Sequence, residues 1–269
     1  MTEPRQPAQD AMAGEAIHQK WVSAYRTADA QAFYERAFDR IVGLLSPQPD
    51  AVILDAGCGS CAKSVLLAAR GFKVVGTDYS PRALELAAQT LRARGLDDRI
   101  TLRQGDLLSL PFPDGEFRYA LCWGVLMHVP EVARALRELA RVLAPGGTLV
   151  VSEGNMHSLQ SVAIRALKRV LGRDRGNVVR TAAGLEATEA TADGTLLTRQ
   201  TDIGWLVAEA DRLGLSLRHR LAGQFTELYV LAPGMPVKRL IHRVNDLWFR
   251  HIRRPGPAFG NILVFEKRS

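Results

Sequence analysis

The sequence is poor in cysteine, with only three in 269 residues. Three cysteines are too few for the disulfide framework of a small secreted protein, which predicts a reducing compartment. No second C-x-x-C pair and no Cys/His pair accompanies Cys58 and Cys61, so the ligands of a structural zinc site are missing from the sequence. We therefore expect no metal.

Long apolar segments are also lacking. No hydrophobic run is long enough to cross a bilayer. The N-terminal stretch MTEPRQPAQDAMAGEAIHQ has neither the basic start nor the apolar core of a secretory signal. Internal repeats and low-complexity tracts are absent as well. These absences predict a cytoplasmic globular protein, and 47% hydrophobic residues suffice for one large domain or a domain with a cap.

Acidic residues are too few to balance the basic ones, which gives a net charge of +7. The surplus gathers in two C-terminal clusters, at residues 165–175 and 238–254, in each of which a single Asp opposes at least five Lys and Arg. Such clusters are typical of solvated helix faces or of a surface that meets an anionic partner. Because no nucleic-acid-binding motif accompanies them, nucleic acid is not expected.

Aromatic Trp248 and Phe249 lie inside the second cluster. Cations mixed with aromatic rings suit a small-molecule acceptor that carries phosphate or carboxylate. They equally suit a lipid-linked acceptor at an anionic membrane surface, which would make the membrane contact peripheral. Both alternatives stay open at this point, beside that of ordinary solvated helices.

Short apolar runs alternate with helical patterns between residues 51 and 153. The expected strands are AVILD, FKVVGTD, RITLRQGD, FRYALCW and GTLVVSE. Ser80 and Pro81 predict the start of one of the helices between them. This alternation predicts βαβ units and a doubly wound, mostly parallel α/β sheet.

The pattern changes after Glu153. A basic helical stretch at 157–172 leads into a polar segment rich in Thr and Ala, which suits a lid or cap. Residues 201–215 are helical again, 215–231 predict a strand pair or one long strand, and 258–267 predict the last strand.

The stretch LDAGCGSCAKS, at residues 54–64, joins the first strand to its helix and has two interpretations. Its C-x-x-C pair at such a junction suits a redox site. Alternatively, Gly57-x-Gly59-x-x-Ala62 fits a relaxed dinucleotide fingerprint, with Asp78 about twenty residues further on. Asp55 favours another ligand, because its carboxylate would repel a pyrophosphate at this helix terminus. The same carboxylate would attract the sulfonium and ammonium groups of S-adenosylmethionine.

Together with GTDYS, QGDLLSLPF, LCWGVLMHV and RVLAPGGTLVVSE, this loop resembles the class I S-adenosylmethionine-dependent methyltransferases. The resemblance covers residues 51–153 and is strongest to the small-molecule type of ubiquinone and menaquinone biosynthesis. Cys61 replaces the third glycine of the family pattern D-x-G-x-G-x-G, which places a side chain near the expected methionine end of the cofactor. Cys58 and Cys61 would then line a cofactor loop without thiol chemistry.

The resemblance implies a role for each motif residue. Asp78 would bind the ribose hydroxyls, Asp106 would accept from the adenine amine, and Trp123 would form a wall of the methyl-transfer cavity. His128 is a candidate proton acceptor for catalysis. The remaining residues expected to contact the cofactor are Asp55, Gly57, Cys58, Gly59, Tyr79, Leu107 and, from an aromatic-rich N-terminal helix, Tyr25. Helix capping, turn formation or core packing would also explain several of these residues.

Polar groups further along the chain are candidates for the acceptor side. They are Glu153, Asn155, Glu227 and Tyr229, the last two on the late strand. Nothing in the sequence ranks them, and it leaves the acceptor, the methylated atom and the oligomeric state open.

The fold expected is therefore a Rossmann-like, doubly wound sheet of seven strands, mostly parallel with an antiparallel last strand. Residues 1–45 would form an N-terminal helical cap and 46–269 the methyltransferase domain. A partly helical insert is expected at about 156–200 and a basic helical insertion at about 234–255. The expected reaction is in-line methyl transfer to a small-molecule acceptor. The alternatives are an NAD-dependent oxidoreductase on the same fold and a non-catalytic cofactor-binding module.

Overall fold

The computed structural model describes residues 27–172, 178–191, 194–230, 232 and 234–269. Tyr25, which we expected to contact the cofactor, lies outside the described residues. Two β-sheets organise the described part of the chain, one of seven strands and one of three.

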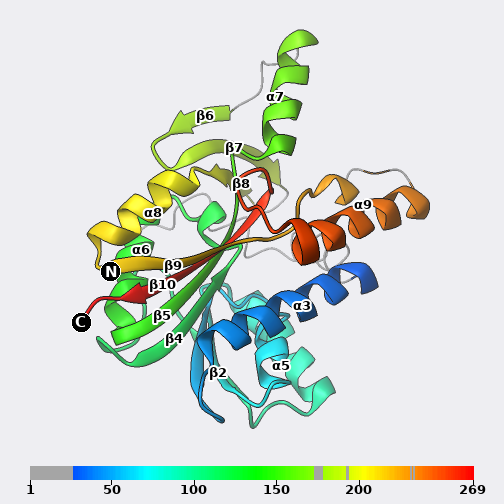
Figure 1. Ribbon diagram of the computed structural model, residues 1–269. Helices are drawn as coiled ribbons and strands as arrows, with labels where there is room; N and C mark the ends of the chain where they lie inside the picture. The colour runs from blue at the N-terminus through cyan, green and yellow to red at the C-terminus, as the bar shows by residue number, and fades with distance from the viewer. Residues whose placement is uncertain (1–26, 173–177, 192–193, 231, 233) are drawn as a thin grey trace.

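The large sheet has the strand order β3-β2-β1-β4-β5-β10-β9 (Figure 1). Its strands are β1 (Val52–Ala56), β2 (Lys73–Asp78), β3 (Ile100–Gln104), β4 (Phe117–Trp123), β5 (Leu143–Gly154), β9 (Leu215–Ala222) and β10 (Gly260–Lys267). Neighbours among β1 to β5 pair in parallel, whereas β10 is antiparallel to both β5 and β9. The predicted doubly wound sheet with an antiparallel last strand is confirmed.

Helices cover both faces of this sheet. They are α3 (Ala28–Leu45), α4 (Ser64–Ala68), α5 (Pro81–Arg94), α6 (Val132–Val142) and α8 (Ile203–Arg212). Figure 1 shows α3 and α5 on one side of the sheet and α6 and α8 on the other. The predicted start of α5 is confirmed, because the Ser80 hydroxyl accepts the amide of Ala83 and Pro81 follows directly.

The strands of the large sheet contribute side chains to two separate hydrophobic cores. Along β1, Ile53 packs with the α3, α4 and α5 side, and Leu54 packs with the α6 and α8 side. Along β5, Val150 and Val151 divide between the two cores in the same way. Successive side chains of a strand point to opposite faces. The near-continuous apolar runs of these strands are therefore the consequence of burial on both sides.

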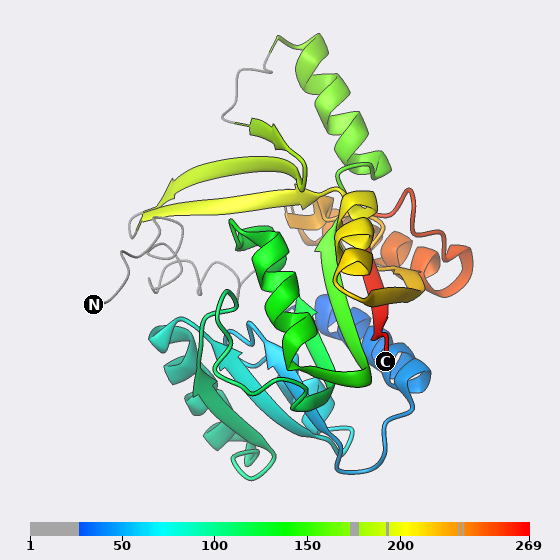
Figure 2. The same ribbon diagram turned by 90° about the vertical axis from the view of Figure 1, so that its left-hand side faces the viewer.

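The region between β5 and α8 contains a helix and the small antiparallel sheet. These elements are α7 (Leu159–Val170), β6 (Val178–Thr181), β7 (Gly184–Thr191) and β8 (Gly194–Thr201). Figure 2 shows β7 and β8 crossing above the large sheet, with α7 projecting from the body of the molecule. The Thr- and Ala-rich segment that suited a lid is thus a β-sheet, in agreement with the β-propensity of its threonines.

One secondary-structure prediction was wrong. Beyond β9 the chain forms a short 3-10 helix, η2 (Leu228–Val230), so Glu227 and Tyr229 do not lie on a strand. Side chains take the place of a strand partner here: Asn245 Oδ1 accepts the amide of Thr226, and Gln160 Oε1 accepts that of Glu227. These side-chain partners lie far away in the sequence, so local propensity cannot predict them.

The segment before β10 is helical. It comprises α9 (Met235–Leu247) and a π-helical turn, η3 (Trp248–Ile252). Within the described ranges, none of the helices combines the length and the apolar character needed to span a bilayer.

Candidate functional site

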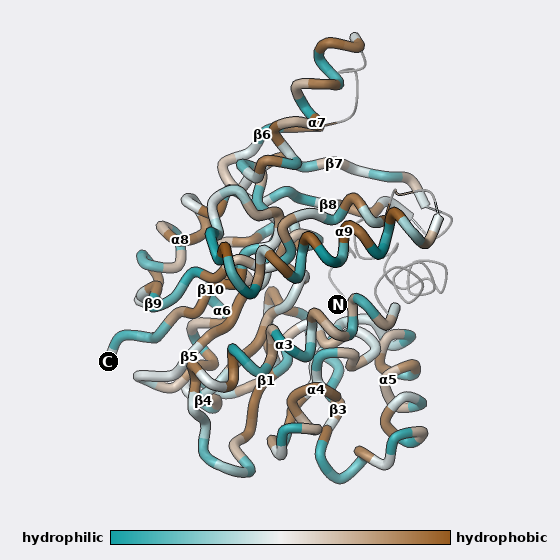
Figure 3. The backbone as a smooth tube through the Cα atoms, turned by 45° about the vertical axis from the view of Figure 1, so that its right-hand side comes forward, coloured by the Kyte–Doolittle hydropathy of each residue, from teal (hydrophilic) through white to brown (hydrophobic). Residues whose placement is uncertain are grey.

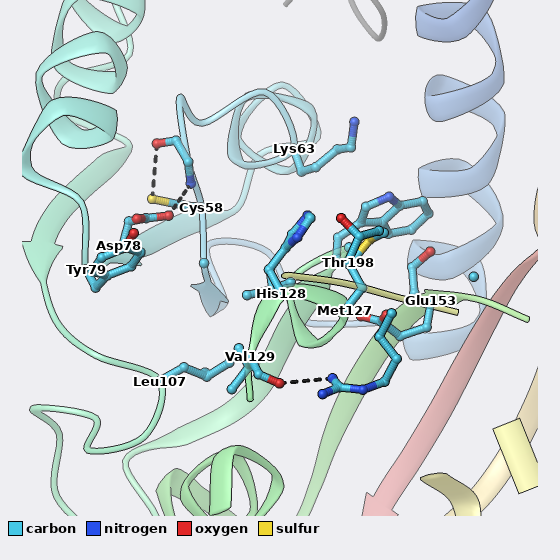
Figure 4. A pocket seen from close by; sticks show the side chains of 18 of the residues that line it. Cys58, Lys63, Asp78, Tyr79, Leu107, Met127, His128, Val129, Glu153 and Thr198 are labelled. Atoms are coloured by element: carbon cyan, nitrogen blue, oxygen red, sulfur yellow. Dashed lines mark hydrogen bonds between the residues drawn. The ribbon is translucent and has the colours of Figure 1, made fainter. Parts of the chain in front are cut away.

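A cavity of about 540 Å³ opens at the carboxyl edge of the large sheet. The loops after β1, β2, β3 and β4 line it, which is where doubly wound sheets bind ligands, and its volume is that of a small-molecule site. In Figure 4, Asp78 and Tyr79 lie on one side of the cavity, Glu153 and Thr198 on the other, and His128 between them.

The glycine loop forms one wall. Gly57 has a φ of 80°, and a Cβ there would lie 2.5 Å from Cγ2 of Val125, so only glycine fits. The amides of Gly57 and Cys58 both donate to the carbonyl of Thr77, at 2.8 and 2.9 Å. The amide of Gly59 donates to Oδ2 of Asp78 at 2.9 Å. The loop is thereby attached to the end of β2.

Asp78, predicted to bind ribose, is at the end of β2. It lines the cavity, and its second oxygen, Oδ1, accepts the amide of Ser80 at 3.0 Å. These two bonds orient the carboxylate at the mouth of the cavity. Each carboxylate oxygen accepts more than one hydrogen bond, so the arrangement fits a vicinal diol.

Asp55 departs from expectation. Within the described structure it is buried and is not among the residues that line the cavity. Its Oδ2 accepts the Ser64 hydroxyl at 2.5 Å, beneath the loop and at the start of α4. Burial raises the pKa of Asp55 to about 6, opposed by the bond from Ser64. The structure therefore assigns this carboxylate to the support of the loop, because its side chain points into the protein.

Cys61 also departs from expectation. It adopts a left-handed backbone with a φ of 62°, as the missing glycine would, and its side chain is buried in the core beside α3 and α4. Only Cys58 of the pair lines the cavity. The hydrogen bond with Cys61 and burial raise the pKa of the Cys58 thiol well above its ordinary value. A thiol of raised pKa is a poor nucleophile and a poor metal ligand. Among the described residues, no group of three or more His, Cys, Asp or Glu is placed to hold a metal ion.

The loop after β3, which we predicted to bind adenine, forms another wall of the cavity. Asp106 and Leu107 both line the cavity, as does Tyr79 from the loop after β2. Oδ1 of Asp106 accepts the amide of Leu108 at 2.9 Å. A Cβ at Gly105 would lie 2.6 Å from the ring of Pro111, so this loop needs glycine for its close turn.

Aromatic rings close another side of the cavity. Trp123 lines it and packs against Tyr34 and Phe38 of α3, with ring centroids 6.1 and 5.3 Å away. The Nζ of Lys63 lies 3.0 Å from the Tyr34 ring centroid, and both residues line the cavity. The sequence indicated an aromatic helix near the cofactor, but nothing in it singled out Lys63.

His128 is at the end of a 3-10 turn, η1 (Leu126–His128), and lines the cavity. Its Nδ1 lies 2.7 Å from the carbonyl oxygen of Leu197 on β8. A carbonyl only accepts, so Nδ1 carries the proton and Nε2 is the basic nitrogen of the neutral ring. Burial lowers the pKa of His128, which keeps the ring neutral at physiological pH.

Glu153 and Gln224 form the end of the cavity opposite the glycine loop. Their side chains are 2% and 6% exposed. Oε1 of Glu153 and Nε2 of Gln224 have no hydrogen-bond partner among the described residues, although both residues line the cavity. Burial raises the pKa of Glu153 to about 8 and that of nearby Glu227, which also lines the cavity, to about 7. Buried polar atoms without partners are rare, and Glu153 and Gln224 are thus free to bind a polar ligand in the cavity.

The other two acceptor-side candidates have structural roles. Asn155 donates through Nδ2 to the carbonyl of Gly256 at 2.8 Å. The Tyr229 hydroxyl donates to Oε1 of Gln224 at 3.2 Å and so orients that amide. Neither residue is among those that line the cavity in the described structure.

The small sheet covers the cavity. Leu196, Thr198 and Gln200 alternate along β8 and all line it. Arg199, only 1% exposed, anchors the strand by donating to Glu186 and to the carbonyls of Leu126 and Val129. The sequence did not identify Arg199, because its partners come together only in the folded chain.

Comparison with known proteins agrees with this geometry. A family model described as a methyltransferase domain matches residues 54–151. The chain is 40% identical over 116 residues to the demethylmenaquinone methyltransferase of Thermus thermophilus, covering 42% of this chain and 52% of that protein. It is 30% identical over 145 residues to the 27-O-demethylrifamycin SV methyltransferase of Amycolatopsis mediterranei, covering 54% and 53%. The chain thus spans about half the length of these curated relatives.

Among solved structures, the magnesium protoporphyrin IX methyltransferase of Synechocystis PCC 6803 with bound SAH superposes with a TM-score of 0.63. The two share 18% identity, and the match covers 97% of this chain and 98% of that one. The likeness supports the fold. The family model confirms the predicted methyltransferase domain at residues 54–151.

Proposed function

We propose that this chain, whose residues 54–151 match a methyltransferase domain, is a class I S-adenosylmethionine-dependent enzyme that methylates an uncharged hydroxyl or amine group of a small molecule. The observation that supports this most is the division of the cavity. The glycine loop and Asp78 build one end, and the partnerless polar atoms of Glu153 and Gln224 build the other.

The charges at the first end suit the cofactor. S-adenosylmethionine is a cation at its sulfonium, and the carboxylates of Asp78 and Asp106 line this end beside a single ammonium group, that of Lys63. We infer that Asp78 holds the ribose, that Asp106 and Leu107 hold the adenine, and that Gly57 and Gly59 allow the methionine end to approach the backbone. A pyrophosphate would meet the same acids unfavourably, which disfavours the NAD-dependent alternative.

The second end suits an uncharged polar group. With a pKa of about 8, Glu153 holds its proton at neutral pH and both donates and accepts hydrogen bonds. The amide of Gln224 adds a donor. The described residues of the two basic clusters do not line the cavity, so they supply no counter-charge for an anion there. We therefore propose an acceptor whose reacting end is uncharged.

His128 is the proposed proton acceptor. When bound, S-adenosylmethionine supplies an electrophilic methyl group. Nε2 of His128 would take the proton from the O–H or N–H of the acceptor as that atom is methylated. The bond of Nδ1 to Leu197 holds the ring in the required tautomer. The β8 lid excludes water, and Glu153 and Gln224 position the acceptor.

Calorimetry with S-adenosylhomocysteine, S-adenosylmethionine and NAD tests the proposal. We expect both sulfur compounds to bind and NAD not to. Binding of NAD alone would establish the oxidoreductase alternative and refute ours. Release of S-adenosylhomocysteine in the presence of a panel of phenols, alcohols and amines then tests turnover. A panel of simple carboxylates is the contrasting control, and preference for carboxylates would contradict the acceptor class.

A further inference from the structure

The outer face of α9 is apolar and exposed. Val237, Leu240, Val244 and Leu247 follow one another at the spacing of a single helix face. All four are exposed, Leu240 to 61% and Leu247 to 54%. Figure 3 shows hydrophobic segments recurring along α9 at the surface of the molecule. We call these four residues the α9 stripe. Contiguous exposed apolar surface of this kind marks an interaction site.

The inner face of α9 is already packed against the protein. Phe249, in η3, is buried and meets the Phe33 ring edge-on at a centroid distance of 5.3 Å. His242 lies 4.4 Å from the Tyr229 ring, and Asn245 is buried. The stripe therefore cannot turn inward without breaking these contacts, and its exposure is a property of the folded chain.

Basic residues flank the stripe. Arg239 and Arg243 lie beside it and are exposed. Asp246 is the only acid between residues 238 and 254, and it is bound by Arg36 at 2.6 Å and Arg250 at 3.0 Å. An apolar face bordered by arginine is the composition of a helix that lies in the interface of an anionic bilayer.

Helix α7 repeats the pattern independently. Its exposed apolar residues are Leu159, Val162, Leu167 and Val170, followed by Leu171. Lys168 and Arg169 are exposed beside them. Figures 1 and 2 both show α7 standing away from the rest of the described chain.

Both helices hold the acceptor end of the cavity. Gln160 of α7 accepts the Thr226 hydroxyl and the amide of Glu227. Asn245 of α9 accepts the amide of Thr226 and donates to its carbonyl, both at 2.9 Å. The segment 224–227, which includes Gln224 and Glu227 of the cavity wall, is thus clamped between the two amphipathic helices.

We propose that α9, assisted by α7, docks this protein on the surface of an anionic lipid bilayer, beside the acceptor end of its cavity. A second copy of the chain fits the stripe poorly, because two faces rich in arginine would repel each other. The polar reacting group of an acceptor anchored in lipid would then reach Glu153 and Gln224 from the membrane side. That last step rests on the proposed function, whereas the docking itself does not.

Vesicle cosedimentation tests the docking. The full chain should bind phosphatidylcholine vesicles that contain phosphatidylglycerol, bind pure phosphatidylcholine weakly, and lose binding as salt rises. Leu240→Ser with Leu247→Ser tests the apolar stripe, and Arg239→Glu with Arg243→Glu tests the charges. Each double variant should reduce partitioning by at least about tenfold.

The matched control is Arg92→Glu with Arg94→Glu at the exposed end of α5, which makes the same change of charge elsewhere. It should bind vesicles like the parent. Thermal melting and affinity for S-adenosylhomocysteine should be unchanged in all variants, because none of these residues lines the cavity.

Three outcomes would overturn the docking. They are a parent that ignores anionic vesicles, a control that loses binding as the α9 variants do, or a dimer seen by sedimentation that the Leu240/Leu247 variant abolishes while vesicles are not bound. A parent that binds vesicles but not S-adenosylhomocysteine would refute the proposed function alone.

Discussion

Nδ1 of His128 lies 2.7 Å from the carbonyl oxygen of Leu197 and so joins the loop after β4 to the lid strand β8. One contact thereby sets the tautomer of the candidate base and closes the cavity over it. A residue 69 positions away decides which ring nitrogen faces the substrate.

His128→Gln should abolish most turnover and spare the cofactor site. We expect a fall in kcat of roughly a hundredfold or more, with affinity for S-adenosylhomocysteine within about twofold of the parent. Because burial lowers the pKa of His128, the parent should stay active below the ordinary titration range of histidine and lose activity only at lower pH. His219→Gln, on the exposed part of β9, is the control. An unchanged kcat would remove His128 from the mechanism.

Asp78→Asn should weaken the binding of S-adenosylmethionine. It removes a charge from the mouth of the cavity, and a hydrogen bond to a charged group contributes about 1.5–3 kcal/mol, or at least about tenfold in affinity. Asp55→Asn should change affinity by less than about threefold, since its carboxylate faces Ser64 and not the cavity. Exposed Asp97→Asn is the matched control in the same calorimetry. Equal losses at Asp55 and Asp78 would contradict the geometry.

Glu153→Gln should stabilise the protein at high pH. The folded chain raises the pKa of Glu153 from 4.5 to about 8, so between these values the folded state holds a proton that the unfolded state has lost. The stability contributed at this position therefore falls as pH rises from about 4.5 to 8. Gln resembles the protonated acid and does not titrate.

The melting temperatures of the Glu153→Gln variant and the parent should nearly coincide at pH 5 and separate at pH 8. The separation should be at least about 2–4 °C, which corresponds to about 1 kcal/mol. Glu116→Gln, an exposed carboxyl, should show no such trend. A difference in melting temperature that does not widen with pH would mean that Glu153 is ionised in the folded state.

The cysteines should be unreactive in the folded protein. Cys58, Cys61 and Cys122 are all buried, and burial raises the pKa of Cys122 as it does that of Cys58. Ellman's reagent should therefore react slowly with native protein and with all three thiols after unfolding. Neither reductant nor chelator should alter affinity for S-adenosylhomocysteine. Rapid reaction of one native thiol, with loss of affinity, would revive the redox interpretation of the C-x-x-C pair.

The sequence was sufficient where a feature depends on short stretches of chain. Apolar runs such as AVILD predicted buried parallel strands, because a strand covered on both faces needs apolar side chains at every position. The sequence could single out Gly57, Gly59 and Asp78, because a tight turn and the end of a strand each depend on a few neighbouring residues. The order of strands then brings all such ends to one edge of the sheet.

Tertiary structure decided the direction in which side chains point. The sequence suggested that Asp55 and Cys61 lie near the cofactor, but the structure buries both: Asp55 accepts the Ser64 hydroxyl from the end of β1, and Cys61 enters the core from a left-handed turn. Glu153 and Gln224 are 71 positions apart and meet only because β5 and the chain after β9 end at the same side of the sheet.

The difference between what local sequence and tertiary contacts determine also applies to the surface helix α9. Periodicity shows that α9 is amphipathic, but an apolar stripe has the same pattern whether it packs against a core or faces water. Phe249 and Asn245, on the opposite side of the helical segment, make the inner contacts, and their partners Phe33 and Thr226 come from distant parts of the chain. The sequence by itself determined the fold class and the methyltransferase motifs, from which we predicted the cofactor. The tertiary structure decided which side chains line the far end of the cavity and which face of α9 stays exposed, because both depend on contacts between segments that are remote in the chain.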